Sequence, residues 1–476
     1  MYVLLALLIL GYTCYFSYYT ILNHYKLGTS TCDFTIFQNA FINTLHGNFM
    51  SVSISPFDGR SLLSQHHDFI FLVYLPFFYL FPKSETLLII QSASIAFAAL
   101  PLFLFGKKVL KSTPVAVSIA AFFLLHPANH GPNFYDIHQI SFLPISVFLL
   151  FYFLERKSIF GFMISVLLIL GIKDDMYILL LFVSLFIYLN GRENLRFVWY
   201  SFISAFIYGF AYNTVGRIWN IIPTFFYYEG IMVDKNGGLL ELIKTVIANP
   251  LHAIRAVITK DKILYVAQLF GPVAFIPLLR KQNFLLFVYG LAATLLATRP
   301  FLYKISFQYV WYVVPFLFIG LVYVLKDVQT INQSLISPLK TLKGRIYPLL
   351  ITVFFASFIY SWQYGAFPNN TYFIGGFRKV DFTFTAEDKR RLQALNNIVA
   401  RIPPNASISA SDCITPHLLN HVNVKKFASP DNSEPEYLFL RDPNFERQDY
   451  LEHLKDIHAY KVIYREGGFQ LLKRSK

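Results

Sequence analysis

The residue that most invites a chemical role in this chain is an aspartate close to a membrane. Asp33 lies in the polar segment STCDFTIFQNAFINTLHGNF, shortly after an apolar run over residues 2–22. A carboxylate held at the lipid boundary costs free energy unless it has a partner or a task. The same carboxylate could simply cap the amphipathic segment that follows it. We therefore expect Asp33 to be either a general base or a helix cap.

Other polar side chains stand at the ends of later apolar runs and could join such a site. They are His66 and His67, Asp136 and His138 in FYDIH, Lys173, Asp174 and Asp175 in IKDD, and Arg299, Lys304 and Gln308 before a late apolar run. The cations and the histidine pair could take up the developing charge of a phosphate. The alternatives are ordinary ones: headgroup anchors, interfacial histidines and a self-neutralising helix end.

A metal site is less clearly indicated by these residues. Asp136 and His138, at i and i+2, do not share a helix face, although a loop could bring them together on a metal ion. No spacing marks a structural zinc site. A divalent ion such as Mg²⁺ or Mn²⁺, bridging Asp33 and a carboxylate of another loop, is the metal site that the sequence leaves open.

Composition assigns the chain to the polytopic membrane proteins. Of its 476 residues, 55% are hydrophobic and 14% charged, whereas soluble domains carry about 25% charged residues. Residues 2–22 have no basic leader and no cleavage site, which predicts a retained signal anchor. The net charge of +14 is spread over short loops, which favours membrane orientation over nucleic-acid binding. Three cysteines exclude a disulfide framework, although Cys32 and Cys413 could pair.

The apolar runs predict eleven membrane-spanning helices. They are expected at 2–22, 86–106, 113–128, 139–155, 158–172, 176–190, 197–216, 263–279, 284–298, 308–325 and 346–362. Residues 69–82, interrupted by Pro76, form only a short apolar run, which suits an interfacial or re-entrant helix better than a crossing.

The basic clusters in the short loops all fall on one side of this arrangement. They are Lys107, Lys108 and Lys111, Arg156 and Lys157, Arg192 and Arg196, Arg280 and Lys281, and Lys340, Lys343 and Arg345. The positive-inside rule makes that side cytoplasmic. The candidate site residues then lie outside, and the inner loops offer only orientation charges.

Two regions lie outside the membrane besides the first outer loop, 23–85. The outer loop 217–262 contains a helical pattern that suits either a membrane-surface helix or a helix packed on the tail. The tail, 363–476, should be a small extracytoplasmic α/β domain that covers the active face. We expect a helix capped by Thr385 and ended by Pro403, strands at 406–411, 423–428, 436–441, 459–465 and 469–473, and helices at 415–421 and 444–456.

An outward-facing site at the lipid boundary suits a substrate that arrives through the lipid. Inverting transfer of a sugar from a polyprenyl-phosphate donor needs one base for the acceptor hydroxyl and cations for the departing phosphate. Asp33 is the candidate base. The first loop, FYDIH and KDD should then converge on one outward cavity that opens to lipid.

Several segments resemble an uncharacterised family of prokaryotic membrane proteins, over most of the chain. They are the run from CDFTIFQNAF to FLFGKKVL, FYDIHQISFLPI, KDD, SFQYVWYVVPFLFIG and the tail segment IPPNASISASDCITPHLLNH. That family is similar in turn to the glycosyltransferase C superfamily of protein mannosyltransferases, oligosaccharyltransferases and lipid A aminoarabinose transferase. The resemblance implies Asp33 as base, 69–82 as a juxtamembrane helix, and a substrate-binding set that includes Gln38, Gln308 and Tyr309.

The sequence therefore predicts a glycosyltransferase-C-like membrane domain over 1–362 and a hexosyl- or pentosyltransferase activity at the outer face of a plasma membrane. Its partners would be a polyprenyl-phosphate sugar and membrane lipids, and no nucleic acid. One alternative is a transporter or flippase of lipid-linked sugars, which would need a polar path between paired charges at the inner helix ends. The other is a structural membrane protein. Donor sugar, acceptor and oligomeric state are left open.

Overall fold

A computed structural model describes residues 1–54, 59–64, 67–218, 227–235, 238–330, 346–421, 423–427, 434–441 and 459–475. The chain divides into two compact units. Unit 1 comprises Met1–Phe16, His67–Ile70 and Gln91–Val380, and unit 2 comprises Ser17–His66, Phe71–Ile90 and Asp381–Lys476. The predicted domain boundary at residue 362 stays a prediction.

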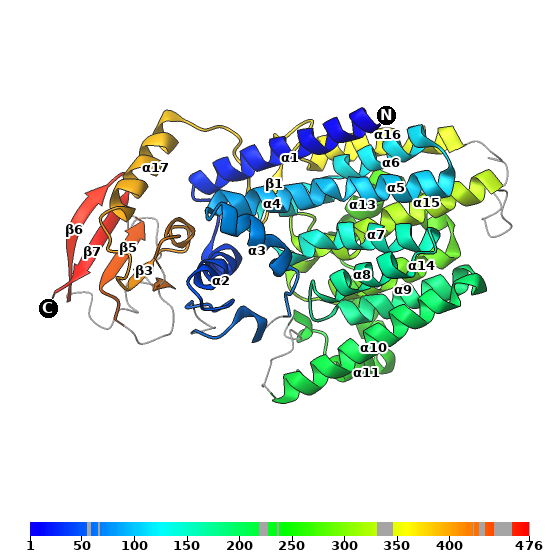
Figure 1. Ribbon diagram of the computed structural model, residues 1–476, viewed down its shortest axis with the longest axis horizontal. Coiled ribbons are helices and arrows are strands. Elements are labelled where there is room, and N and C mark those ends of the chain that lie inside the picture. The colour runs from blue at the N-terminus through cyan, green and yellow to red at the C-terminus, as the bar shows by residue number, and fades with distance from the viewer. Residues whose placement is uncertain are drawn as a thin grey trace. The chain divides into compact units, whose positions relative to one another are not determined.

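Unit 1 is a bundle of apolar helices. It contains the start of α1 (Tyr2–Tyr25), the end of α4 (Ser84–Phe97), α5 (Ala99–Leu110), α6 (Thr113–Leu125), α7 (Leu143–Glu155), α8 (Ile159–Leu170), α9 (Met176–Asn190), α10 (Leu195–Ile218), α11 (Gly238–Ala248), α12 (Pro250–Val257), α13 (Lys260–Phe270), α14 (Phe284–Leu295), α15 (Val314–Thr330) and α16 (Ile346–Tyr364). Helices α5 and α6, α7 and α8, and α9 and α10 pack as pairs. Helices α5, α7 and α15 run nearly parallel to one another in Figure 1. Helix α15 is buried from Val314 to Leu325 and forms the centre of the bundle.

Four helical stretches within the described residues are long and apolar enough to cross a membrane, judged by length and composition. They are Tyr2–Tyr25, Ser84–Leu110, Gln308–Thr330 and Ile346–Tyr364. Shorter apolar helices occupy most of the other predicted spans, so the count of eleven crossings stays a prediction. The predicted span 263–279 is not one helix, because α13 ends at Phe270 and short 3₁₀ turns follow at Gly271–Val273 and Ile276–Leu279. Pro272 and Pro277 account for this break, since proline cannot donate a backbone hydrogen bond.

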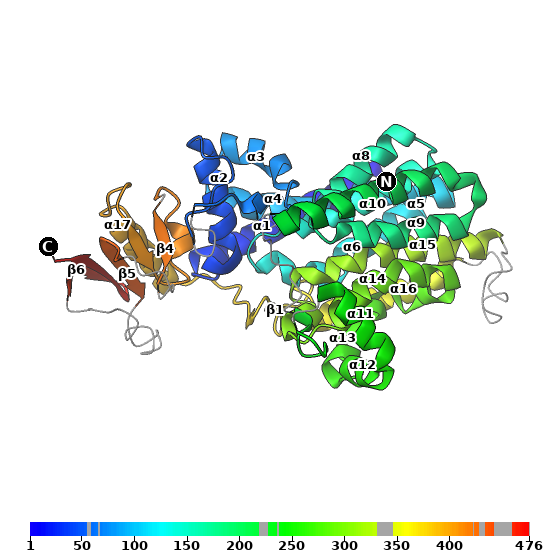
Figure 2. The ribbon, with the colours of Figure 1, turned by 90° about the horizontal axis from the view of Figure 1, so that it is seen from below.

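The outer loop 217–262 carries two helices where the sequence indicated one. Helix α11 ends at Ala248 and α12 starts at Pro250, because proline suits the first turn of a helix and not its interior. Both helices belong to unit 1, where Leu242 and Ala253 are buried in a cluster with Ile231, and Leu296 packs against it. Figure 2 shows α11 and α12 as separate short segments. The alternative of a helix packed on the tail is therefore not needed to bury their inner face.

Unit 2 combines the first outer loop with most of the tail. The loop contributes a π-helical turn, Thr31–Thr35, followed by α2 (Ile36–Leu45) and, further along the loop, α3 (Phe71–Leu80). At 1.5 Å per residue, α3 is about 15 Å long, which is about half the thickness of the hydrocarbon core. Its predicted interfacial position, rather than a crossing, stays a prediction.

The tail is an α/β domain, as the sequence predicted. Helix α17 (Ala386–Val399) is capped by Thr385 in a capping box whose second member is Asp388. In the described residues the strands are β3 (Ile408–Ala410), β4 (Val424–Lys426), β5 (Tyr437–Arg441), β6 (Tyr460–Glu466) and β7 (Phe469–Arg474). Their order is β4-β3-β5-β7-β6, with β3 parallel to β4 and β5, and with antiparallel pairing of β7 to β5 and β6.

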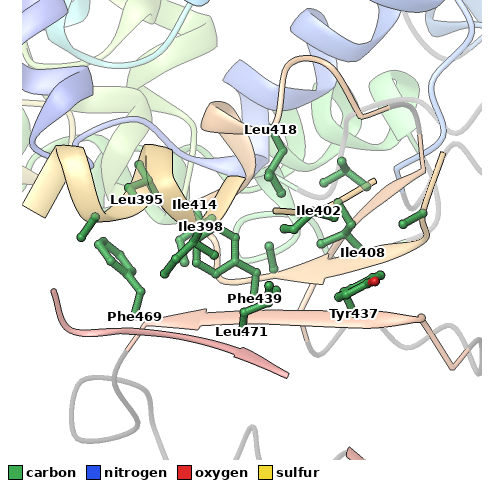
Figure 3. Close-up of a cluster of buried hydrophobic side chains, with 14 of the residues drawn as sticks. Leu395, Ile398, Ile402, Ile408, Ile414, Leu418, Tyr437, Phe439, Phe469 and Leu471 are labelled. Atoms are coloured by element: carbon green, nitrogen blue, oxygen red, sulfur yellow. The ribbon is translucent and has the colours of Figure 1, made fainter. Parts of the chain in front are cut away.

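The core of the tail lies between α17 and this sheet. Leu395 and Ile398 of α17 pack against Ile408, Phe439 and Leu471 from three neighbouring strands (Figure 3). Leu27, in the first outer loop just after α1, is buried in the same cluster. The first outer loop and the tail therefore share one hydrophobic core.

The expected elements of the tail are mostly confirmed. All five strands are present, and Gly467 and Gly468 form the hairpin turn with φ of 57° and 82°. The predicted helix 415–421 is reduced to a 3₁₀ turn, Thr415–His417, and the predicted helix 444–456 lies outside the described residues. The sequence did not indicate the short hairpin of β1 (Ile374–Gly375) and β2 (Arg378–Lys379), which belongs to unit 1.

Candidate functional site

The KDD segment of unit 1 forms the polar centre of a candidate site. It occupies the turn between α8 and α9, and Asp175 stands at the N-cap of α9 without capping it. Its Oδ2 atom accepts hydrogen bonds from the Tyr289 hydroxyl at 2.7 Å and the Tyr312 hydroxyl at 2.8 Å. The segment is thus tied to α14 and to the 3₁₀ turn Gln308–Tyr312 that precedes α15.

Lys173 provides a positive charge beside this carboxylate. Its Nζ atom lies 4.0 Å from Oδ2 of Asp175 and donates to the Tyr312 hydroxyl at 3.3 Å. Burial alone would lower the pKa of Lys173, but the nearby Asp175 and Asp174 carboxylates outweigh it and raise the pKa. The ring of Tyr309 lies 5.7 Å from Nζ, within cation–π range. Lys173 therefore stays protonated.

A cavity of about 360 Å³ adjoins this polar group, within the range of ligand pockets of ~300–1,000 Å³. Its polar lining residues are Lys173, Asp175, Tyr227, Tyr228, Tyr289, Tyr309 and Tyr312. The rest of its wall is apolar and comes from α9, α11, α14 and the turn after it, through Ile178, Phe182, Leu239, Leu242, Ile243, Val246, Ile247, Ala292, Ala293, Leu296 and Leu302. The cavity can therefore hold a ligand with a charged group and an apolar body.

A second acidic group is built around Asp174 and Asp68. Asp174 accepts a hydrogen bond from Tyr212 of α10 at 2.7 Å, and Asp68 accepts one from Gln139 at 3.0 Å. Oδ1 of Asp174 and Oδ2 of Asp68 are buried and have no hydrogen-bond partner among the described residues. Burial, and then the Asp174 charge, raise the pKa of Asp68 well above its usual value. His67 lies beside this group, with its ring 5.1 Å from that of Tyr212, and burial lowers its pKa.

The FYDIH segment is held by α4. Gln91 donates to the backbone oxygen of Asp136 at 2.7 Å and accepts from the backbone N–H of His138 at 2.7 Å. Asp136 has a φ of 49°, and the His138 ring stacks on Tyr135 at 5.3 Å. Both residues are buried, and neither lines the cavity.

The late group of predicted residues is split. Tyr309 lines the cavity, and Gln308 is buried beside it in sequence with an Oε1 atom that has no partner among the described residues. Arg299 and Lys304 flank the turn Pro300–Tyr303 and are exposed, outside the cavity lining.

The remaining predicted residues belong to unit 2 or are not described. Asp33 lies in the π-helical turn Thr31–Thr35, half-buried. The Gln38 amide is engaged inside unit 2, where it donates to Ser84 Oγ at 2.7 Å and to the backbone oxygen of Pro416 at 3.1 Å. His66 lies outside the described residues, as does the Cys32 side chain that the expected pairing with Cys413 needs. The expected convergence of Asp33 with KDD stays a prediction.

Metal binding gains no support from the geometry. Across the described residues, no group of three or more His, Cys, Asp or Glu side chains is arranged to hold a metal ion. A divalent ion bridging Asp33 and a second carboxylate stays a prediction of the sequence.

Sequence reasoning missed the tyrosines that organise the KDD turn and did not select Asp68. Tyr212, Tyr289 and Tyr312 come from three elements distant in sequence, so no local spacing points to them. Asp68 did carry a signal, since it directly follows His67 at the end of a polar segment and precedes an apolar run.

Comparisons with known proteins agree with this architecture. ArnT from Cupriavidus metallidurans bound to undecaprenyl phosphate is similar over 98% of this chain and 97% of its own, with a TM-score of 0.53 and 10% sequence identity. The apo state of the same protein gives a TM-score of 0.48 at 11% identity, over 97% of each chain. No curated protein matches the sequence.

The similarity to ArnT shows that this membrane protein has a glycosyltransferase C fold with a C-terminal α/β region. A family model described as "Predicted membrane protein (DUF2079)" matches residues 23–472. That match covers most of the printed sequence and includes both outer regions and the KDD segment. The chain therefore belongs to the DUF2079 family of predicted membrane proteins.

Proposed function

We propose that this protein is a membrane glycosyltransferase that takes its sugar from a polyprenyl-phosphate donor. The observation that carries the proposal is the cavity of unit 1, which combines a half-buried cation with long apolar walls. A lipid-linked sugar phosphate has the same two parts, a phosphate diester and an isoprenoid chain. The headgroup would lie at the Lys173 end and the first isoprene units along α9, α11 and α14.

The KDD turn suits a phosphate for an electrostatic reason. Asp175 lies 4.0 Å from Lys173, beyond ordinary hydrogen-bond length, and its Oδ2 atom is satisfied by two tyrosine hydroxyls. An ammonium group has three donors, and in the described part of the chain the Tyr312 hydroxyl is the acceptor that lies within reach. Lys173 therefore keeps donors available for a phosphate oxygen, and such charge-assisted bonds are the strong ones.

The structural neighbour supports the class of ligand. ArnT has been solved with undecaprenyl phosphate bound, so a glycosyltransferase C fold of this length accommodates a polyprenyl phosphate. At 10% identity this likeness shows the fold alone. The assignment of the ligand to this chain therefore depends on the cavity and its Lys173 end.

Asp33 is the proposed base of the reaction. Its carboxylate would take the proton from an acceptor hydroxyl while that oxygen attacks the anomeric carbon of the donor sugar. The bond from that carbon to the phosphate oxygen breaks, the phosphate leaves with the electron pair, and the configuration inverts. A half-buried aspartate in a rare π-helical turn fits such a role, because single π turns recur at functional sites. The reaction would take place at the external face of the membrane, as the charge distribution predicts.

The binding half of the proposal is tested with undecaprenyl phosphate itself. Native mass spectrometry of the detergent-purified protein should show a bound lipid phosphate, and Lys173→Ala should weaken binding by roughly tenfold or more, because a charge-assisted bond is lost. Lys244→Ala is the matched control: Lys244 lies on the cavity-wall helix α11 but its side chain is exposed and pairs with Glu241. Equal binding by Lys173→Ala and wild type would overturn this placement of the phosphate.

The catalytic half is tested by Asp33→Asn. Assayed with a panel of polyprenyl-phosphate hexoses and pentoses, this variant should lose about 10²–10⁴ in transfer rate, as expected for loss of a general base, while still binding undecaprenyl phosphate. A helix cap would behave differently, with reduced stability and unchanged activity per folded molecule. Transfer at near wild-type rate by folded Asp33→Asn would remove Asp33 from the mechanism.

A further inference from the structure

The carboxyl end of strand β3 is the place in the tail where a small α/β domain would be expected to bind something. β3 has parallel neighbours on both sides, β4 and β5. In open α/β sheets, ligands bind outside the carboxyl ends of such strands. From this end the chain continues into a turn, residues 411–417, which includes the 3₁₀ turn Thr415–His417.

The π-helical turn that carries Asp33 is bound at this end of β3. The backbone N–H of Thr31 donates to Oδ1 of Asp412 at 3.0 Å. The Thr415 hydroxyl bridges the first and last residues of the π turn, at 2.8 Å from Thr31 Oγ1 and 2.9 Å from Thr35 Oγ1. Asp33 lies midway between these two threonines, so the tail holds both ends of its turn.

The same turn of the tail contacts three further segments of the first-loop region. The backbone oxygen of Pro416 accepts from Gln38 of α2 at 3.1 Å and from Ser84 of α4 at 3.2 Å. The His417 ring stacks on His24, near the end of α1, with centroids 4.1 Å apart. The contact therefore consists of specific hydrogen bonds and a ring stack, and Thr31, Thr35 and Thr415 within it are buried.

The turn is itself fixed to the sheet. The backbone N–H of Ser411 donates to Phe439 of β5 at 3.1 Å, and its hydroxyl accepts from the Arg441 backbone N–H at 2.9 Å. Lys426 of β4 lies 3.3 Å from Asp412 Oδ1, and the Thr415 hydroxyl also reaches the Asp412 backbone oxygen at 3.2 Å. Because these bonds fix Asp412 and Thr415 to the sheet, the sheet also fixes the positions of the groups that bind Thr31 and Thr35.

We propose that the tail binds the Asp33 turn as an internal ligand, and that Asp412 and Thr415 are positioning residues for Asp33. The tail is then a working part of the catalytic site and not only its cover. This inference rests on the proposed role of Asp33 as base. It assigns to the tail the task of keeping a π-helical turn, which is rare without tertiary support, in one conformation.

The expected loss of rate follows from how precisely a general base must be positioned. A displacement of about 1 Å at the reacting groups can cost ~10²-fold in rate. Removing the Thr415 hydroxyl leaves both ends of the π turn without their shared partner. We therefore expect Thr415→Val to lower kcat by ~10- to 100-fold. KM for the lipid donor should stay unchanged, because the variant keeps Lys173, the cation proposed to bind the donor phosphate.

The docking is tested first without any substrate. Hydrogen exchange of the full-length protein should be at least ~10-fold faster at residues 31–35 in Thr415→Val and in Asp412→Ala, and unchanged in α17 and β7. Ser407→Ala is the matched control, because the Ser407 hydroxyl accepts from the Glu436 backbone N–H beside the same sheet and, among the described residues, makes no hydrogen bond to the first loop. Wild-type exchange at 31–35 in both variants would overturn the docking, whatever their activity.

The kinetic arm separates positioning from mere stability. Thr415→Ser restores the bridging hydroxyl, so it should recover most of the lost kcat, while Ser407→Ala should keep wild-type kcat after correction for folded protein. Faster exchange at 31–35 with unchanged kcat in Thr415→Val would overturn the positioning role. Full activity of Asp33→Asn would instead contradict the proposed base, and the exchange result would stand independently of it.

Discussion

At the scale of single residues, the KDD turn shows how three adjacent charges acquire different roles. Lys173 and Asp175 line the cavity, whereas Asp174 turns toward Tyr212 and joins a separate acidic group that includes Asp68. Adjacent residues in a turn point in different directions, so their neighbours come from different helices. A run of charges that looks self-neutralising in sequence is therefore divided in the structure.

Asp68 leads to a prediction about pH. Because its pKa is raised in the folded protein, the native state holds a proton that the unfolded state loses above about pH 4. Stability from this residue is present at low pH and declines as pH rises toward the folded pKa. Asp68→Asn mimics the protonated form, so it should raise the melting temperature more at pH 8 than at pH 5.

A matched control for Asp68→Asn exists in unit 2. Asp381 hydrogen-bonds with Lys26, which, with the bonds to Thr383, lowers its pKa to about 2. Its contribution to stability is complete above the unfolded pKa of about 4 and is lost as pH falls from there through the folded value, so Asp381→Asn should shift the melting temperature equally at pH 5 and pH 8. An Asp68→Asn effect that is equal at both pH values would contradict a raised pKa.

At the scale of elements, the helix ends that the sequence predicts to be cytoplasmic are more polar than expected. Arg280 was counted among the orientation charges, yet its Nε atom donates to Asp327 of α15 at 2.9 Å, and its remaining nitrogens reach Asn190 and Asn283. Both ionic partners are buried. The expectation that the inner loops offer only orientation charges is wrong at this position, and the argument against a transporter that relied on it is weakened. The two charges nevertheless pair with each other, so the ion pair can fix the turn before α14 against α15.

The contribution of the Arg280–Asp327 ion pair to stability can be tested by comparing single and double variants. Asp327→Ala leaves Arg280 buried without its counter-charge and should destabilise the folded protein by ~3–5 kcal/mol, as breaking a buried pair does. Arg280→Met combined with Asp327→Leu should cost much less, because no charge is then left buried. Thermal unfolding in detergent measures both. Equal destabilisation by the single and double variants would show that packing, not the ion pair, holds these helices.

The position of helices α11 and α12 also depends on how whole elements pack. Their inner face lines the cavity or packs on Leu296, while Leu240, Leu251 and Ile254 are exposed. An amphipathic pair with exposed apolar side chains in a membrane protein suits the membrane interface. The predicted position of this loop at the membrane surface therefore accounts for both the buried and the exposed face of the two helices, and it stays a prediction.

At the scale of the whole molecule, orientation in the membrane is the main prediction. The basic clusters predict that the first outer loop and the tail lie on the external side, and within unit 2 these two regions share a core and a network of hydrogen bonds. Regions that fold together must lie on one side of the membrane. Single cysteines introduced at exposed residues Asn48 and Arg401 should both react with a membrane-impermeant reagent in intact cells. Labelling of the tail only after lysis would refute the topology.

The sequence by itself determined the class of protein and most of its local structure. Composition and long apolar runs indicate a membrane bundle, because an apolar helix satisfies its own backbone hydrogen bonds within lipid. Alternating strands, Thr385 and the glycine pair 467–468 mark the tail, because capping and hairpin turns depend on adjacent residues. Resemblance and spacing together also singled out Asp33 and the KDD segment.

Only the tertiary structure decided which of these residues work together. The tyrosines around Lys173 and Asp175, the burial of Asp68, the Arg280–Asp327 pair and the contact of Thr415 with the Asp33 turn all join residues far apart in the chain. Such contacts depend on how helices and strands pack, and no local spacing encodes them. The tail's binding of Thr31 and Thr35 is the clearest case, since 380 or more positions separate the partners.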